Sequence, residues 1–172
     1  METRILGTTE ADIRLAAEMI QKGGLVAFPT ETVYGLGADA LNAEAVGKVY
    51  AAKGRPSDNP MIVHIAQKSD MNKLTDGITP EVERLMEAFW PGPLTMVVPA
   101  KDVIPKVTTG GLATVGVRMP EDAIARALIS AAGVPIAAPS ANLSGKPSPT
   151  RYTHVAEDLD GRIDAIIAGN DC

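Results

Sequence analysis

The stretch LVAFPTETVYGLG covers residues 25–37 and joins an apolar run to a polar, glycine-containing segment. Residues 25–28 are four consecutive apolar residues, a pattern typical of a buried β-strand. Upstream, Thr9 is predicted to cap a helix that ends at Gly23–Gly24, because apolar residues recur at helical spacing between them. Downstream, Asn42 is predicted to cap the next helix. A helix, a strand and a second helix therefore follow one another along this part of the chain.

The same alternation continues to the end of the sequence. Strands are expected at 61–66, 94–98, 113–117, 134–138 and 164–168, and helices are expected from Thr79, from Pro120 and over 153–159. Alternating strands and helices predict an α/β or α+β domain built on one twisted sheet, and the pattern leaves parallel and mixed pairing both open. Because no repeat or linker interrupts the pattern, residues 1–172 are predicted to form a single domain.

The composition narrows the class of protein. Hydrophobic residues make up 45% and charged residues 22%, which excludes wholesale disorder. The net charge of −5 and the aromatic content of 3% argue against a globally basic nucleic-acid binder. The single cysteine, Cys172, excludes a disulfide framework and fits a reducing compartment, so a cytoplasmic location is expected. No apolar run reaches roughly 18 residues, so no membrane helix is expected.

Polar residues gather in four segments that follow predicted strands or helices. These segments are 28–37, 53–60, 108–111 with Arg118, and 139–150. Their hydroxyl and amide groups suit neutral polar ligands, and their lysine and arginine residues suit anions. The chain has neither the glycine-rich phosphate loop of nucleoside triphosphatases nor the dinucleotide-binding fingerprint. Its two histidines, His64 and His154, together with the terminal cysteine, form no metal-ligand set.

Each candidate residue also has a structural explanation when it is taken alone. Thr32 is explained as a strand-end hydroxyl bonded to its own backbone, and His64 as a core residue of its strand. Lys53 and Arg55 are explained as the solvated end of a helix, and Asn59 as a turn residue before a proline.

Glycines and prolines are interpreted as architecture. Pro29, Gly35 and Gly37 are predicted to form turns, and Trp90 is predicted to pack in the turn that residues 90–95 make between a helix and a strand.

Five ordered segments resemble one known family. They are PTETVYGLGADA (29–40), the K-G-R-P-x-x-N-P-x-x-V-H run (53–64), WPGPLT (90–95), VGVRMP (115–120) and APSANLSGKPSPT (138–150). Together they resemble the YrdC/Sua5/TsaC family of L-threonylcarbamoyl-AMP synthases over about residues 8–172. The resemblance implies a YrdC-like domain with a twisted, open, mixed sheet, flanking helices and a concave ligand cleft. Family members usually continue into an E-S-T-V-V-D-like segment and a later ATP-contacting arginine, so the resemblance implies that this chain, which stops at Cys172, lacks them.

The resemblance also implies a reaction and a set of site residues. L-Threonine, bicarbonate (or CO2) and ATP would give L-threonylcarbamoyl-AMP and pyrophosphate, and partner proteins would then transfer the threonylcarbamoyl group to an adenosine of tRNA. Mg²⁺ would be carried on the ATP phosphates without protein ligands. Thr32, His64, Arg118 and Ser140 match threonine-binding positions; Arg55, Asn59, Thr114, Asn142 and Thr150 match ATP-binding positions; and Lys53 and Arg55 are the candidate catalytic cations. No covalent enzyme intermediate is needed, so positioning and electrostatics would provide the catalysis.

Three alternatives remain open. The chain could be a non-catalytic module that binds double-stranded RNA, including tRNA. It could be a carbamoyl-transfer domain such as the related domain of hydrogenase-maturation proteins, although the cysteines of their zinc-finger regions are absent from this sequence. It could also be an inactive fragment that folds and binds one ligand.

Overall fold

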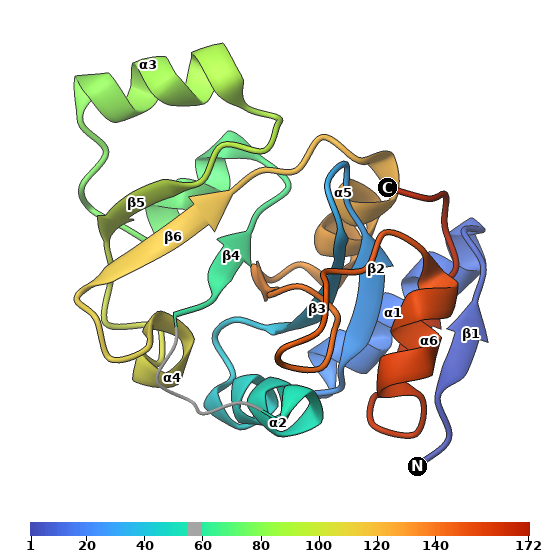
Figure 1. Cartoon of the computed structure of the whole chain (residues 1–172). Coiled ribbons are helices and arrows are strands. Elements are labelled where there is room, and N and C mark those ends of the chain that lie inside the picture. The colour runs from blue at the N-terminus through green and yellow to red at the C-terminus, as the bar shows by residue number, and fades with distance from the viewer. Residues whose placement is uncertain (55–59) are drawn as a thin grey trace.

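The computed structural model describes residues 1–54 and 60–172, and an eight-stranded sheet runs through its centre (Figure 1). The strands are β1 (Arg4–Leu6), β2 (Val26–Pro29), β3 (Tyr34–Asp39), β4 (Ile62–His64), β5 (Met96–Pro99), β6 (Thr114–Arg118), β7 (Ile136–Ala137) and β8 (Ala165–Ile167). The helices are α1 (Glu10–Gln21), α2 (Ala43–Lys53), the 3₁₀ helix η1 (Lys68–Lys73), α3 (Pro80–Phe89), α4 (Lys106–Thr109), α5 (Ala123–Ala132) and α6 (Tyr152–Leu159).

The strand pairing makes the sheet mixed. The order is β1-β8-β2-β3-β7-β4-β6-β5. The pairs β1–β8, β2–β8 and β4–β6 are parallel, whereas β2–β3, β3–β7, β4–β7 and β5–β6 are antiparallel. The predicted alternation and the single mixed sheet are therefore confirmed.

The predicted helix starts are confirmed at the level of single hydrogen bonds. The hydroxyl of Thr9 accepts from the backbone N–H of Asp12, and the side chain of Asn42 accepts from that of Ala45. Thr79 caps α3 in the same way, with Pro80 as its first residue. Side-chain acceptors of this kind satisfy the N–H groups that a helix leaves unpaired at its first turn.

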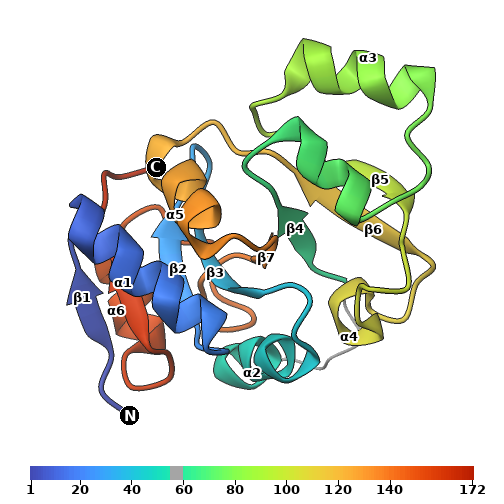
Figure 2. The same ribbon diagram turned by 180° about the vertical axis from the view of Figure 1, so that it is seen from behind.

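Helices cover both faces of the half of the sheet that contains β1, β8, β2 and β3. Helices α1 and α5 lie together on one face, and α6 lies on the other (Figures 1 and 2). The buried residues of α1 and α5 share a core with Val26 and Phe28, whereas those of α2 and α6 share a second core with Ala27 and Leu36. Neighbouring residues of a strand point to opposite faces, so β2 contributes to both cores.

Gly35 and Gly37 correct the sequence prediction, because they lie inside β3 and not in a turn. Pro29 ends β2, Gly35 pairs with Phe28, and Gly37 pairs with Val26. A Cβ atom on Gly37 would lie 2.7 Å from Cε1 of Phe28. Gly37 therefore makes room for a buried ring. The sequence also does not predict the short elements β1, η1 and α4.

The other half of the sheet, formed by β4, β6 and β5, has one uncovered face. Ile62 and Val97 are register partners of Gly116, and their exposed fractions are 39% and 69%. The alternation of side chains places His64 and Arg118 on this same face, at the ends of β4 and β6. Both residues are buried: the loop after β2 contacts Arg118, and the ring of Phe28 lies against His64.

Candidate functional site

The loop of residues 30–33 joins β2 to β3 and is fixed by one hydroxyl. Oγ1 of Thr30 donates to the carbonyl of Val33 at 2.6 Å and accepts from the N–H groups of Thr32 and Val33, both at 3.2 Å. Thr30 is buried, so these bonds are shielded from water. The two side chains between these anchors, those of Glu31 and Thr32, both contact Arg118.

Arg118 is held on three sides by groups from distant parts of the chain. Its Nε donates to the carbonyl of Gly92 at 3.2 Å, and its Nη1 donates to Oγ1 of Thr32 at 3.2 Å. Its Nη2 lies 2.6 Å from Oε1 of Glu31 in an ion pair whose side chains are 9% and 21% exposed. The guanidinium therefore has a fixed orientation at the end of β6.

Glu31 is anchored independently of Arg118. Its Oε2 accepts a hydrogen bond of 2.8 Å from the backbone N–H of Glu121, in the turn before α5. One carboxylate thus connects the loop after β2, the end of β6 and the start of α5. Sequence reasoning missed both Glu31 and Gly92 as site residues, although the acid between two hydroxyl residues in TET was a usable signal.

His64 lies beside Arg118 on the neighbouring parallel strand. Its ring meets that of Phe28 edge to face, with 6.3 Å between the ring centroids. Burial, followed by the positive charge of Arg118, lowers the pKa of His64 from 6.5 to about 4. The imidazole is therefore neutral near pH 7, and its two nitrogens offer one donor and one acceptor.

Three buried side-chain atoms with no hydrogen bond lie in this cluster. Within residues 1–54 and 60–172 they are Oε1 of Glu31, Nδ1 of His64 and Nη2 of Arg118. Two of them form the ion pair, which is close but lacks hydrogen-bond geometry. Buried polar atoms normally have partners, and a group of exceptions at one place indicates a site for a polar ligand.

Lys53 organises the second predicted cluster. It ends α2 and is buried, and its Nζ donates to the carbonyls of Ser140 and Asn142, the latter at 2.8 Å. Its own carbonyl accepts from the N–H of Ser144 at 2.9 Å. In the structure this predicted catalytic cation thus holds the loop of residues 139–150 against α2.

Ser140 and Asn142 are bonded to each other inside this loop. Oγ of Ser140 donates to Oδ1 of Asn142 at 2.6 Å. The amide Nδ2 of Asn142 donates to the carbonyls of Leu143 at 2.7 Å and Lys146 at 2.9 Å. The Asn142 side chain, a predicted ATP contact, is therefore engaged in shaping its own loop.

The loop of residues 139–150 is also bonded to the start of β3. Ser140 forms a β-bridge with Gly35, and the N–H of Ala141 donates to the carbonyl of Tyr34 at 2.9 Å. Because Tyr34 directly follows the loop of residues 30–33, these bonds place Ser140 near Thr32 in the fold. The structure thus brings together the two polar segments from residues 28–37 and 139–150.

The remaining predicted residues lie away from the Arg118 cluster or outside the described residues. Thr114 is on the same face of β6 as Arg118, but at the other end of the strand, roughly 13 Å away. Thr150 is exposed, and its carbonyl accepts from the N–H of Cys172 at 2.8 Å. Arg55 and Asn59 belong to residues 55–59, which lie outside the described residues.

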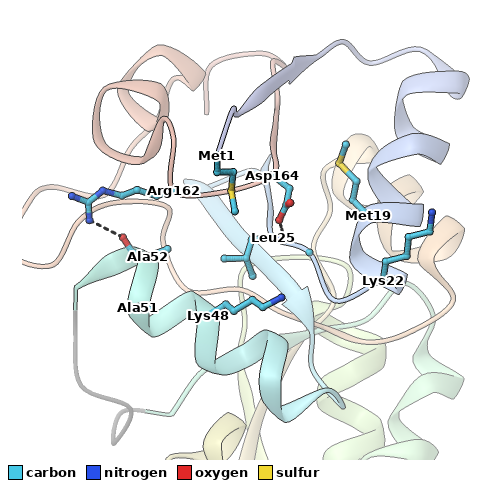
Figure 3. A pocket seen from close by; sticks show the side chains of 10 residues that line it. Met1, Met19, Lys22, Leu25, Lys48, Ala51, Ala52, Arg162 and Asp164 are labelled. Carbon is cyan, nitrogen blue, oxygen red and sulfur yellow. Dashed lines mark hydrogen bonds between the residues drawn. The ribbon is translucent and has the colours of Figure 1, made fainter.

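A well-formed pocket lies elsewhere, between the C-terminal end of α1 and helix α2 (Figure 3). Its volume is about 520 Å³, and none of the predicted site residues lines it. Lys22 and Lys48 are among the residues that line it, and the carboxylate of Asp164 accepts from the N–H of Leu25 at 2.8 Å. No group of three His, Cys, Asp or Glu side chains in residues 1–54 and 60–172 could hold a metal ion. None of the helices in these ranges is long and apolar enough to cross a membrane.

Comparison with known proteins identifies the family. The model of the Sua5/YciO/YrdC family, which carries the description "Telomere recombination", matches residues 18–172. The chain belongs to the Sua5/YciO/YrdC family. Among curated Sua5/YciO/YrdC proteins, the chain is 57% identical over 162 residues to the threonylcarbamoyl-AMP synthase of Pyrococcus abyssi, and 56% identical over 165 residues to that of Bacillus subtilis.

The structural match to this family is equally close. The fold matches the crystal structure of P. abyssi Sua5 complexed with L-threonine with a TM-score of 0.96 and 55% identity, over 98% of this chain and 51% of that one. The two curated matches cover 94% and 95% of this chain and 48% of each relative. The chain thus spans about half the length of the relatives that it matches.

Proposed function

We propose that this chain binds L-threonine and ATP and, with bicarbonate or CO2, forms L-threonylcarbamoyl-AMP and pyrophosphate. The observation that carries the proposal is the cluster of Glu31, His64 and Arg118, in which each side chain has one buried polar atom without a hydrogen bond. The names of the curated relatives and the threonine complex of P. abyssi Sua5 support the same activity.

Threonine is assigned to the end of β6. Arg118 is the cation for its carboxylate, since a guanidinium can donate two parallel hydrogen bonds to a carboxylate. Thr32 supplies a hydroxyl group that is bonded to this cation, Ser140 supplies one from the loop that is bridged to Gly35, and neutral His64 adds a donor or an acceptor. A small zwitterion that carries a hydroxyl group matches this set of partners.

ATP is assigned to the uncovered face of β6 and the loops beside it. Thr114, Asn142 and Thr150 are its proposed contacts among the described residues, and Arg55 and Asn59 are proposed contacts outside them. Lys53 acts by positioning the loop of residues 139–150, to which it is bonded. Mg²⁺ enters bound to the phosphate oxygens of ATP, as is usual for this hard cation.

The chemistry needs alignment more than a reactive side chain. The free amine of threonine adds to CO2 and releases a proton, which gives a carbamate. One carbamate oxygen then attacks the α-phosphorus of ATP as its bond to pyrophosphate breaks. This is a nucleotidyl transfer, and positioning with charge stabilisation can supply its rate. In the cytoplasm, partner proteins would then move the threonylcarbamoyl group to tRNA.

The test is release of pyrophosphate from ATP in bicarbonate buffer without tRNA. We expect release with L-threonine and little with L-valine, which has a similar shape but no hydroxyl group. A buried hydroxyl partner left unpaired lowers affinity by roughly tenfold to a hundredfold. Release that does not depend on threonine would contradict the proposal, and binding of RNA without turnover would favour a non-catalytic RNA-binding module.

A further inference from the structure

The Glu31–Arg118 pair places one negative and one positive group side by side at the threonine site. The two charges are 2.6 Å apart, and both interacting atoms are buried. We infer that Glu31 binds the α-ammonium group of the amino acid while Arg118 binds its α-carboxylate, so that the pair selects a zwitterion. This inference rests on the proposed function, because it assigns a residue to the threonine site.

The charge balance of the cluster favours a zwitterion over an anion. His64 is neutral near pH 7, so the charges of Glu31 and Arg118 cancel. A ligand with only a carboxylate would meet the attraction of Arg118 and the repulsion of Glu31 at nearly the same distance. An α-amino acid carries its ammonium group and its carboxylate on the same carbon atom. One molecule can therefore contact Glu31 and Arg118 at once.

Both members of the pair are fixed before a ligand arrives. Glu121 holds Oε2 of Glu31, while Gly92 and Thr32 hold Nε and Nη1 of Arg118. A carboxylate can accept about four hydrogen bonds and a guanidinium can donate five, so each group retains unused capacity. A preorganised pair of this kind loses little conformational freedom on binding.

The competing explanation is that Glu31 only neutralises a buried arginine. A substitution of Glu31 would then disturb Arg118 and lower the affinity for every carboxylate ligand equally. The two explanations are separated by a ligand that keeps the carboxylate and the side chain of threonine but lacks its ammonium group. The 2,3-isomer of dihydroxybutanoate, in which a hydroxyl replaces that ammonium group, is such a ligand.

The experiment measures binding of L-threonine and of dihydroxybutanoate by calorimetry, for the unchanged chain and for Glu31→Gln. Glutamine keeps an acceptor for Glu121 and removes the charge. We expect the unchanged chain to bind threonine more tightly than dihydroxybutanoate. Glu31→Gln should lower the affinity for threonine roughly tenfold to a hundredfold and the affinity for dihydroxybutanoate by less. Glu31→Asp, which keeps the charge, should retain part of the preference if the Gln variant is poorly folded.

A matched control is Glu10→Gln, which removes a charge from an exposed pair with Arg14 on α1 and should change neither affinity. Equal weakening of both ligands by Glu31→Gln would overturn the inference and leave the proposed function standing, as would equal binding of both ligands by the unchanged chain. If the unchanged chain does not bind threonine, the proposed function and the inference are both wrong.

Discussion

His64 and Arg118 are register partners on the adjacent parallel strands β4 and β6, so a histidine and a permanent cation lie side by side in a buried place. This position makes protonation of His64 unfavourable, because the charged ring would be shielded from water and would lie beside the positive charge of Arg118. The relationship has a direct consequence for the pH dependence of stability.

We expect the fold to lose stability as the pH falls through the window from about 6.5 to about 4. In this window His64 takes up a proton in the unfolded chain but not in the folded one, because folding lowers its pKa from 6.5 to about 4. The loss attributable to His64 should approach about 3 kcal/mol at the lower limit. Above the window the contribution of His64 to stability is complete and constant.

Urea unfolding at about pH 7.5 and about pH 4.5 measures this loss. His64→Gln has no titrating ring, so the difference between its two unfolding free energies should be smaller by the contribution of His64. A pH dependence identical in the two proteins would contradict the assignment. His154→Gln is the control, because His154 is exposed.

Arg118 and Arg55 should affect different ligands. Arg118→Ala removes the proposed partner of the threonine carboxylate, and a lost charged hydrogen bond corresponds to a decrease in affinity of roughly tenfold to a hundredfold. The affinity of this variant for ATP should change little. Arg55→Ala should instead lower the affinity for ATP and leave the affinity for threonine unchanged. Calorimetry with each ligand separately tests this, and two variants that weaken the same ligand would refute the assignment.

Lys53 should matter for stability as well as for activity. Lys53→Met leaves the carbonyl groups of Ser140 and Asn142 without their cationic donor, so we expect a loss of about 2–4 kcal/mol in unfolding free energy. Lys48→Met is the matched control on the same helix. Lys48 is exposed and makes one bond of 3.3 Å to the carbonyl of Gly23, so its loss should be below about 0.5 kcal/mol. Equal losses in the two variants would show that the Lys53 bonds are unimportant.

The sequence predicts the helices well because their starts are local. Thr9, Asn42 and Thr79 cap helices through bonds to residues only three positions away. The strand β3 is predicted poorly for the opposite reason. The close contacts that exclude a side chain at Gly37 come from Phe28 and Ile136 on other strands, and nothing in the local sequence distinguishes the glycines of β3 from turn residues.

The candidate site shows the same division between local and distant information. The five family segments supply Thr32, His64 and Arg118 as candidates, and the structure places these three together. Glu31 acquires a role only through Arg118, which is 87 positions further along the chain, and through the backbone of Glu121. A role that depends on such separated partners follows from the fold and not from a motif.

Gly37 and Gly47 should respond in opposite ways to the same substitution. A Cβ atom on Gly37 would lie 2.7 Å from the ring of Phe28 and 2.9 Å from Cγ2 of Ile136, so Gly37→Ala overpacks the core and should cost about 1–3 kcal/mol. A Cβ atom on Gly47, in α2, would meet nothing within 4 Å. Gly47→Ala should therefore stabilise the protein by about 0.5–1 kcal/mol, because alanine favours a helix over glycine.

Chemical unfolding of the two variants tests the sign of each change, and a compensating substitution tests its cause. If the Phe28 ring is the obstacle, Phe28→Leu should destabilise the Gly37→Ala background less than it destabilises the unchanged chain, because the smaller side chain relieves the overlap. Additive losses in the double variant would show that the ring is not what excludes a side chain at position 37. Relief by Phe28→Leu would instead identify the pair of Phe28 and Gly37 as the contact that requires glycine in this part of β3.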